Sequence, residues 1–204
     1  MKKILIIAFL SLFSAINAQN SLTPAEVMQK TSSILTAGKG MSADFNITSD
    51  SSGGKGSIKC MGDKFTVTLP DARVWFNGKE LFTFNQRTNE TTITNPTIEE
   101  LSEVNPLEYV KGALKNYTPS FSATKISGKY IIELSPKSKK SEIKKITVQI
   151  NAKDFIIDKI IIEPRSGQKV GIAVLNFKRG LNISTSDFEY PSSTYKTAEI
   201  IDLR

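Results

Sequence analysis

The strongest constraint on the fold is a repeated alternation of apolar and polar residues in short segments, the pattern of half-buried β-strands. Ala43, Phe45 and Ile47 alternate with polar neighbours, and side chains two residues apart in a strand share one face of a sheet. Clusters of Gly, Asn, Ser and Asp, which favour tight turns, separate these segments. We count about ten strands, with strand-like segments at 41–48, 56–61, 64–69, 73–76, 80–85, 90–94, 121–126, 129–135, 143–150, 155–163, 170–178, 188–190 and 197–203.

The N-terminal part of the predicted domain carries a helix-start signal instead. Residues 23–26 form a capping box, and Pro24 suits the first helical position. They predict a helix from Pro24 to about Ala37. Its apolar positions Val27, Ile34 and Leu35 form one narrow stripe.

Two further helix signals interrupt the strands in the middle of the chain. Residues 97–100 form a second capping box, and Asn105 and Pro106 form an N-cap followed by a helix-compatible proline. Each predicts a short helix. In the second helix, Leu107, Val110 and Leu114 lie on one face.

Two strands late in the chain are apolar on both faces. Residues 155–163 and 170–177 contain few polar positions, and a strand that is buried on both faces needs cover on each. Because about ten twisted strands rarely stay flat, we expect the sheet to curl. The sequence therefore predicts an α+β fold, mainly antiparallel β, in which one strongly curved sheet surrounds an apolar hollow and helices cover its mouth.

The first 18 residues have the pattern of an export signal. Lys2 and Lys3 precede an apolar run, Ile4 to Phe13, and Ala18 ends a small-residue cleavage site. We expect cleavage after Ala18 to release a single soluble domain of residues 19–204. Its first residue is Gln19, so it cannot carry the acyl anchor that bacterial lipoproteins attach to an N-terminal cysteine.

The composition excludes several kinds of catalytic chemistry. The chain has no histidine and one cysteine, Cys60, which excludes intrachain disulfides, imidazole-based triads and Cys/His zinc clusters. We expect Cys60 to be buried and inert. The composition does not exclude a hydrolase that uses carboxylates. However, the acid pairs Glu99-Glu100 and Glu103 with Glu108 lie at predicted helix N-termini, where acids stabilise the helix dipole. We therefore expect no enzyme, no metal and no cofactor.

Lysines cluster in one predicted loop, at Lys137, Lys139, Lys140 and Lys144. Such a patch fits an anionic membrane or an acidic partner, and equally a solvated loop that aids solubility. Nucleic acid is not expected as a partner, because the chain is predicted to be exported and the patch lacks aromatic residues that stack on bases.

Aromatic residues gather on one predicted hairpin. Trp75 and Phe76 are adjacent and must point to opposite faces of the sheet, and Phe82 and Phe84 follow in the partner strand. We expect one of the adjacent pair to line the hollow or to pack under a helix.

Four segments, taken together, are similar to those of a known family. They are residues 77–85 (NGKELFTFN), the helix start at 105–107 (NPL), residues 130–137 (YIIELSPK) and residues 181–191 (LNISTSDFEYP). With the export signal and the N-terminal helix, they resemble the LolA-type periplasmic carriers of outer-membrane lipoproteins. The resemblance implies an unclosed β-barrel whose concave apolar face is covered by a helical lid.

The resemblance also implies partners and a latch. Such carriers accept acyl chains of lipoproteins from an inner-membrane transporter and pass them to an outer-membrane receptor, without catalysis or a cofactor, and we expect a monomer. The family's lid-locking arginine follows the strand that corresponds to residues 56–61. This chain has Gly62, Asp63 and Lys64 there, so either Lys64 substitutes or the latch differs.

The predicted faces give a set of ligand-binding residues. We expect Leu107, Val110 and Leu114 of the lid, with Val27 and Ile34, to fill the empty hollow, so that cargo must displace them. The competing hypothesis is an exported interaction or sensor module with a solid core and a basic partner-binding surface. The predicted cavity and lid residues are Val27, Ile34, Phe45, Ile58, Phe65, Val67, Trp75, Phe82, Phe84, Leu107, Val110, Leu114, Ile132, Leu134, Val148, Ile150, Ile160 and Ile162.

Overall fold

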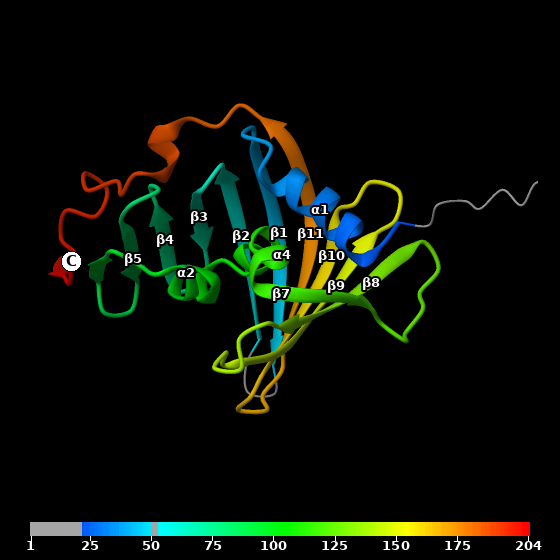
Figure 1. Cartoon of the computed structure of the whole chain (residues 1–204). Coiled ribbons are helices and arrows are strands. Elements are labelled where there is room, and N and C mark those ends of the chain that lie inside the picture. Colours follow the sequence, from blue (N-terminus) through cyan, green and yellow to red (C-terminus); the bar gives the residue numbers. More distant parts are fainter. Residues whose placement is uncertain (1–21, 50–52) are drawn as a thin grey trace, which may run out of the picture.

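A computed structural model describes residues 22–49 and 53–204, so the predicted export signal lies outside the described residues. The described strands form one sheet of twelve, in the order β12-β6-β5-β4-β3-β2-β1-β11-β10-β9-β8-β7. Figure 1 shows that this sheet curls strongly without closing, and that helices lie against its concave face. The fold class predicted from the sequence, an α+β unclosed barrel, is confirmed.

The first half of the sheet is an antiparallel meander. Each strand pairs with the next along the chain. The loop 77–80 between the fourth and fifth strands is four residues long, with the left-handed conformation that glycine favours at Gly78 (φ 97°). The strands are β1 (Gly40–Ser49), β2 (Gly53–Met61), β3 (Lys64–Thr68), β4 (Ala72–Phe76), β5 (Leu81–Asn85) and β6 (Glu90–Thr94).

The second half is another antiparallel meander, joined to the first by the pairing of β1 with β11. A last short strand, β12 (Glu199–Asp202), pairs in parallel with β6 and covers its free edge. The other strands are β7 (Tyr117–Phe121), β8 (Lys129–Pro136), β9 (Ile143–Asn151), β10 (Ile157–Pro164) and β11 (Val170–Leu181).

Two predicted strands are wrong. The strand predicted at 121–126 is β7, which covers 117–121 instead and contains Pro119; proline is tolerated there because β7 is an edge strand. The strand predicted at 188–190 does not form: Phe188 is the last residue of a 3₁₀ turn, Thr185–Phe188, and residues 189 and 190 belong to no strand. The Ser184 hydroxyl accepts a bond from the Ser186 N–H and begins this turn.

An extra residue in β11 changes which side chains face the hollow. Residues 175–178 of β11 lie opposite 42–44 of β1, so β11 contains a bulge. Asn176 adopts a left-handed conformation there (φ 50°), which asparagine tolerates better than most residues. Because of this shift, Val174 and Phe177 both line the hollow although they are three residues apart.

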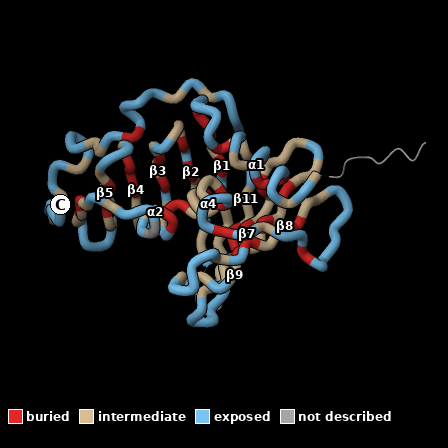
Figure 2. Tube along the Cα trace, viewed as in Figure 1, coloured by how far each residue is buried: buried red, intermediate tan, exposed pale blue. Residues whose placement is uncertain are grey.

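The helices are α1 (Pro24–Leu35), α2 (Ile98–Val104), α3 (Leu107–Lys111) and α4 (Ala113–Asn116). Helix α1 contacts α3, α4, β7 and β8. Figure 2 shows that the buried residues follow the middles of the strands and the helix faces that cover them. The helices thus bury the concave face of the sheet, as the sequence predicts.

We expect Thr97→Ala to destabilise the start of α2 by about 1 kcal/mol. Thr97 Oγ1 accepts a bond from the Glu100 N–H (3.3 Å), and a Glu100 carboxylate oxygen accepts one from the Thr97 N–H (2.7 Å). Amide hydrogen exchange of α2 measures the effect, and unchanged exchange in the variant would contradict it.

The same capping box predicts a pH dependence. The backbone bond from Thr97 lowers the pKa of Glu100 from its ordinary value of 4.5. Its contribution to stability is therefore complete above pH 4.5 and is lost as the pH falls through the lowered folded-state pKa. The protection factors of the α2 amides, which correct for the slower intrinsic exchange at low pH, should fall over that acidic range.

Candidate functional site

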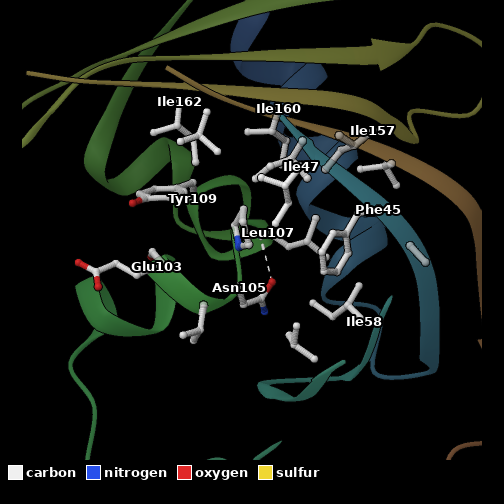
Figure 3. A pocket seen from close by; sticks show the side chains of 18 of the residues that line it. Phe45, Ile47, Ile58, Glu103, Asn105, Leu107, Tyr109, Ile157, Ile160 and Ile162 are labelled. Atoms are coloured by element: carbon white, nitrogen blue, oxygen red, sulfur yellow. Dashed lines mark hydrogen bonds between the residues drawn. The ribbon is translucent and has the colours of Figure 1, made fainter. Parts of the chain in front are cut away.

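The concave face encloses an apolar cavity of about 360 Å³ between the sheet and the segment that contains α2 and α3. Its floor comes from both halves of the sheet, and Figure 3 shows Phe45, Ile58 and Ile160 pointing into it. The lid, which consists of α2, α3 and the residues between them (98–111), closes one side with residues 102–107 and Tyr109. The interior is therefore not solid, which contradicts the filled core of the competing hypothesis.

The cavity wall is almost entirely hydrocarbon. Isoleucines dominate it, at positions 47, 58, 157, 160, 162 and 172. Among the polar residues at its border, Ser102 donates its hydroxyl to the Ile98 carbonyl (2.9 Å), and Asp44 accepts a bond from the Asn176 amide (2.8 Å). Because these groups are already bonded within the protein, the wall favours an apolar guest.

A buried asparagine joins the two lid helices. Asn105 is fully buried between α2 and α3. Its side-chain oxygen accepts a bond from the Leu107 N–H (3.2 Å), drawn in Figure 3, and its amide donates to Glu108 (2.9 Å). These bonds satisfy the polar groups at the α3 start and aim Leu107 into the cavity.

A lysine on the lid ties it to the sheet. Lys111 Nζ donates to Glu108 Oε1 (2.7 Å) and to the Gly62 carbonyl (3.1 Å) in the turn between β2 and β3. The side chains of Lys111 and Glu108 are only 7% and 17% exposed. We call the three residues Lys111, Glu108 and Gly62 the latch. The charged group, Lys111, is on the lid, and the Gly62 carbonyl that it binds is on the sheet. Lys64, which the sequence suggested as a substitute for the family's arginine, takes no part in these contacts.

Tyr109 lies at the cavity border beside Glu103, as Figure 3 shows. Burial, and secondarily the charge of Glu103, raise the pKa of the Tyr109 phenol. The phenol therefore stays neutral over the physiological pH range and adds no charge to the cavity.

Cys60 lies under the lid, next to the latch. It is 1% exposed, and burial raises the pKa of its thiol to about 12, with a smaller opposite effect of Lys111. The prediction that Cys60 is buried is confirmed. A thiol of this kind is protonated and unreactive while the lid is closed.

The structure brings together six of the predicted residues around the cavity. They come from four strands and the lid. They are Phe45, Ile58, Val67, Leu107, Ile160 and Ile162. That they bind a ligand remains a prediction.

Most other predicted residues on the concave face belong to the filled part of the core. Seven of them are fully or almost fully buried without lining the cavity: Val27, Phe65, Val110, Ile132, Leu134, Val148 and Ile150. Ile34 is half-buried at the side of α1, and Leu114 is 38% exposed. The cavity is thus confined to one part of the concave face, and the expectation that all five lid and helix residues fill it is corrected: only Leu107 does.

Trp75, Phe82 and Phe84 lie elsewhere, and their assignment to the cavity is also corrected. Trp75 packs edge-on against Tyr190 (5.5 Å between ring centroids), and Phe82 stacks on the same tyrosine (5.3 Å). Phe84 packs against Tyr195 (4.4 Å). The C-terminal segment 182–198 supplies these tyrosines and packs on the convex face, whereas the neighbouring Phe76 belongs to the core on the concave face.

Sequence reasoning missed many residues that line the cavity. Alternation within β1 and β11 could have found Ala43, Ile47, Val170 and Ile172, which share faces with predicted residues. Residues 102–106 of the lid lie outside the strands, so no alternating pattern could have identified them. The others are Leu35, Asp44, Leu69, Val74, Tyr109, Ile157, Val174 and Phe177.

The basic residues predicted as a partner surface are exposed at one end of the sheet. Lys139 and Lys140 lie in the loop between β8 and β9, and Lys144 follows in β9. Lys137 donates to the Leu114 carbonyl at the end of α4 (2.8 Å). Whether they meet a partner remains a prediction.

The described part of the chain, residues 22–49 and 53–204, contains no group of three or more Cys, Asp or Glu residues that could hold a metal ion. It also contains no helix that combines the length and the apolar character needed to cross a bilayer.

Solved structures show the same fold at low sequence identity. An uncharacterized conserved protein from Thermus thermophilus superposes with a TM-score of 0.60 at 12% identity, over 87% of this chain and 98% of that one. A DUF1329 family protein from Desulfovibrio piger superposes with a TM-score of 0.50 at 9% identity, over 84% of this chain and 99% of that one. These likenesses bear on the fold alone.

Sequence comparison identifies the family. No curated protein sequence matches the chain. The family model described as "Outer membrane lipoprotein carrier protein LolA" matches residues 13–168, which is well over half of the chain. With its curled sheet and lidded cavity, this chain belongs to the LolA family of outer membrane lipoprotein carrier proteins.

Proposed function

We propose that this protein is a periplasmic, non-catalytic carrier that binds acyl chains of lipoproteins, or of related lipids, in the apolar cavity and moves them towards the outer membrane. One observation carries the proposal: a cavity of about 360 Å³, walled by branched aliphatic side chains, remains open inside a folded member of the LolA family. An unfilled apolar space of this kind lacks contacts that a hydrocarbon guest can supply.

The lid explains how such a guest could be held and still be released. Each methylene that leaves water contributes about 0.8 kcal/mol, so an acyl chain that fits the cavity binds tightly. A longer chain also has to displace Leu107 and move α3, whose Val110 is fully buried in the core. Net affinity is then the difference between cargo packing and lid packing, which allows transfer in either direction.

The proteins that would deliver and receive the cargo are proposed from the family to which the chain belongs. An inner-membrane transporter and an outer-membrane receptor are the partners that we propose. The export signal at residues 1–18 would place the protein between them.

We expect Val174→Trp to weaken binding of a fluorescent fatty-acyl probe more than tenfold. Val174 lines the cavity on β11, and an indole there occupies space that about two methylenes of the probe would otherwise fill, at about 0.8 kcal/mol each. Probe fluorescence in a titration gives the two dissociation constants.

The neighbouring residue supplies a matched control. Leu175 is 43% exposed on the opposite face of the same strand, so Leu175→Trp adds a comparable side chain outside the cavity. Equal affinities of Val174→Trp and wild type, with both proteins folded by circular dichroism, would contradict cavity binding.

A further inference from the structure

Two hairpin loops at one end of the sheet form a single surface. The loop 137–142 joins β8 to β9, the loop 165–169 joins β10 to β11, and both hang below the sheet in Figure 1. The Arg165 backbone N–H donates to the Glu142 carbonyl (2.8 Å), and Arg165 Nε donates to the Ser141 carbonyl (2.8 Å). These two bonds hold the loops in one fixed arrangement.

This surface, which we call the basic tip, carries an excess of positive charge. One carboxylate, Glu163, faces three lysines, with oxygens 4.0, 3.6 and 3.4 Å from the Nζ atoms of Lys144, Lys145 and Lys169. The members of the basic tip are Lys137, Lys139, Lys140, Lys144, Lys145, Arg165 and Lys169, with the acids Glu133, Glu142 and Glu163.

The acids of the tip do not neutralise it. Partial burial of Glu163 would raise its pKa, but the hydrogen bond from Lys169 and the charges of the lysines together lower it. The carboxylate is therefore ionised, and its single negative charge is divided among three lysines. Lys144 and Lys169 remain 66% and 60% exposed. Among the described residues, no ion pair involves the exposed Lys139 or Lys140.

The composition of the tip fits a lipid surface better than a protein partner. Cores of protein interfaces are enriched in aromatic residues and arginine and depleted in lysine. The segments 137–145 and 163–169 contain six lysines, one arginine and no aromatic residue. Clusters of four to eight basic residues attract anionic lipid headgroups through their combined charge, without a shaped pocket.

The tip adjoins one end of the cavity. Lys169 directly precedes Val170, and Glu163 directly follows Ile162, and both apolar residues line the cavity. At a strand rise of about 3.3 Å per residue, the tip and this end of the cavity are separated by one or two residues. A bilayer that contacts the tip would therefore lie next to the cavity.

We propose that the basic tip docks on the surface of an anionic lipid bilayer and holds the cavity beside the headgroup layer. The lysines bind headgroup phosphates as point charges, and the described tip residues present no large exposed apolar side chain for insertion. Docking is therefore electrostatic, reversible and sensitive to salt. This inference goes beyond the acyl-carrier proposal, because docking does not require that the cavity be occupied.

The test is co-sedimentation of residues 19–204 with vesicles of phosphatidylcholine that contain phosphatidylglycerol. We expect the triple variant Lys139→Gln, Lys140→Gln, Lys169→Gln to partition about a hundredfold less than wild type, from about fivefold per removed charge. We expect binding in about 0.1 M salt, where the Debye length is about 10 Å, and its loss in about 1 M salt.

A second triple variant is the matched control. Lys79, Lys125 and Lys153 are exposed in loops at the opposite ends of the strands, so replacing them by Gln removes the same charge elsewhere. Equal partition of the two variants, or equal binding of wild type to pure phosphatidylcholine, would overturn the proposal. So would tip-dependent binding to polyglutamate by a protein that ignores anionic vesicles, which would assign the tip to an acidic protein.

The acyl-probe titration separates the two proposals. The tip variant should retain wild-type probe affinity, and Val174→Trp should retain vesicle binding. Failure of one measurement therefore leaves the other interpretable.

Discussion

Phe188→Ala is expected to lower the free energy of unfolding by about 3 to 5 kcal/mol, the usual cost of emptying a buried phenylalanine site. Phe188 is fully buried in the 3₁₀ turn that packs against β3. It anchors the segment 182–198, whose Tyr190 and Tyr195 cover Trp75. Loss of the anchor should loosen this segment before the sheet itself unfolds.

The fluorescence of Trp75 reports on that loosening. The chain contains one tryptophan, which is 8% exposed, so its emission should shift to the red in the Phe188→Ala variant. Phe121→Ala is the control, because Phe121 is 43% exposed and its truncation should cost much less. Unchanged emission and stability in Phe188→Ala would show that the C-terminal segment does not depend on this residue.

Lys111→Met should loosen the lid and lower stability by about 3 kcal/mol, the lower end of the range for breaking a buried ion pair. The substitution leaves Glu108 mostly buried, with Asn105 as its remaining partner. It also removes the bond to the Gly62 carbonyl that ties α3 to the sheet. Chemical denaturation measures the global effect.

The rate at which a reagent labels the Cys60 thiol measures how often the lid opens. Because Cys60 is 1% exposed under the lid, a thiol reagent reaches it only when the lid opens. Labelling should be faster in Lys111→Met than in wild type. An acyl ligand too long for the closed cavity should also accelerate it.

Two further variants make the latch prediction specific. Lys115→Met removes an exposed lysine one turn further on and should label at the wild-type rate. The double variant Lys111→Met, Glu108→Gln removes both charges and should recover stability to within about 1 kcal/mol of wild type. If the double variant is no more stable than Lys111→Met, the loss does not arise from an unpaired Glu108.

Local patterns in the sequence predict most of the elements. The capping boxes at 23–26 and 97–100 are present as predicted, because such caps depend on residues three positions apart. The alternation in β1 to β6 likewise depends on neighbours within one strand. The strand predicted at 121–126 begins too late, because proline at 119 is unfavourable inside most strands and only the sheet order shows that β7 is an edge, where proline is tolerated.

The sequence predicts which residues face the concave side of the sheet, but not which of them line the cavity. Alternation assigns Ile132, Val148 and Ile160 to the concave face, and all three are fully buried there. Only Ile160 lines the cavity, because the position of the helices decides where that face is filled and where it is left open. That position depends on contacts far apart in the sequence.

For the aromatic residues of the β4–β5 hairpin, too, alternation does not show what covers each face of the sheet. Alternation separates Trp75 from Phe76, but both are buried, so their environments cannot be told apart by hydrophobicity. The distinguishing fact is that residues 182–198 return across the convex face. The left-handed Asn176, which turns Phe177 into the cavity, also has no clear counterpart in the periodic pattern.

The parallel strand β12 has a consequence for solubility. Without it, β6 would end the sheet with the sequence ETTIT, a short β-branched strand with unpaired backbone groups, which is a template for association with another copy. β12 covers this edge and ends it with the acids Glu199 and Asp202, and Arg204 clamps the tail to Glu80. Residues 199–204 thus protect the β6 edge of the sheet from pairing with a second copy of the chain.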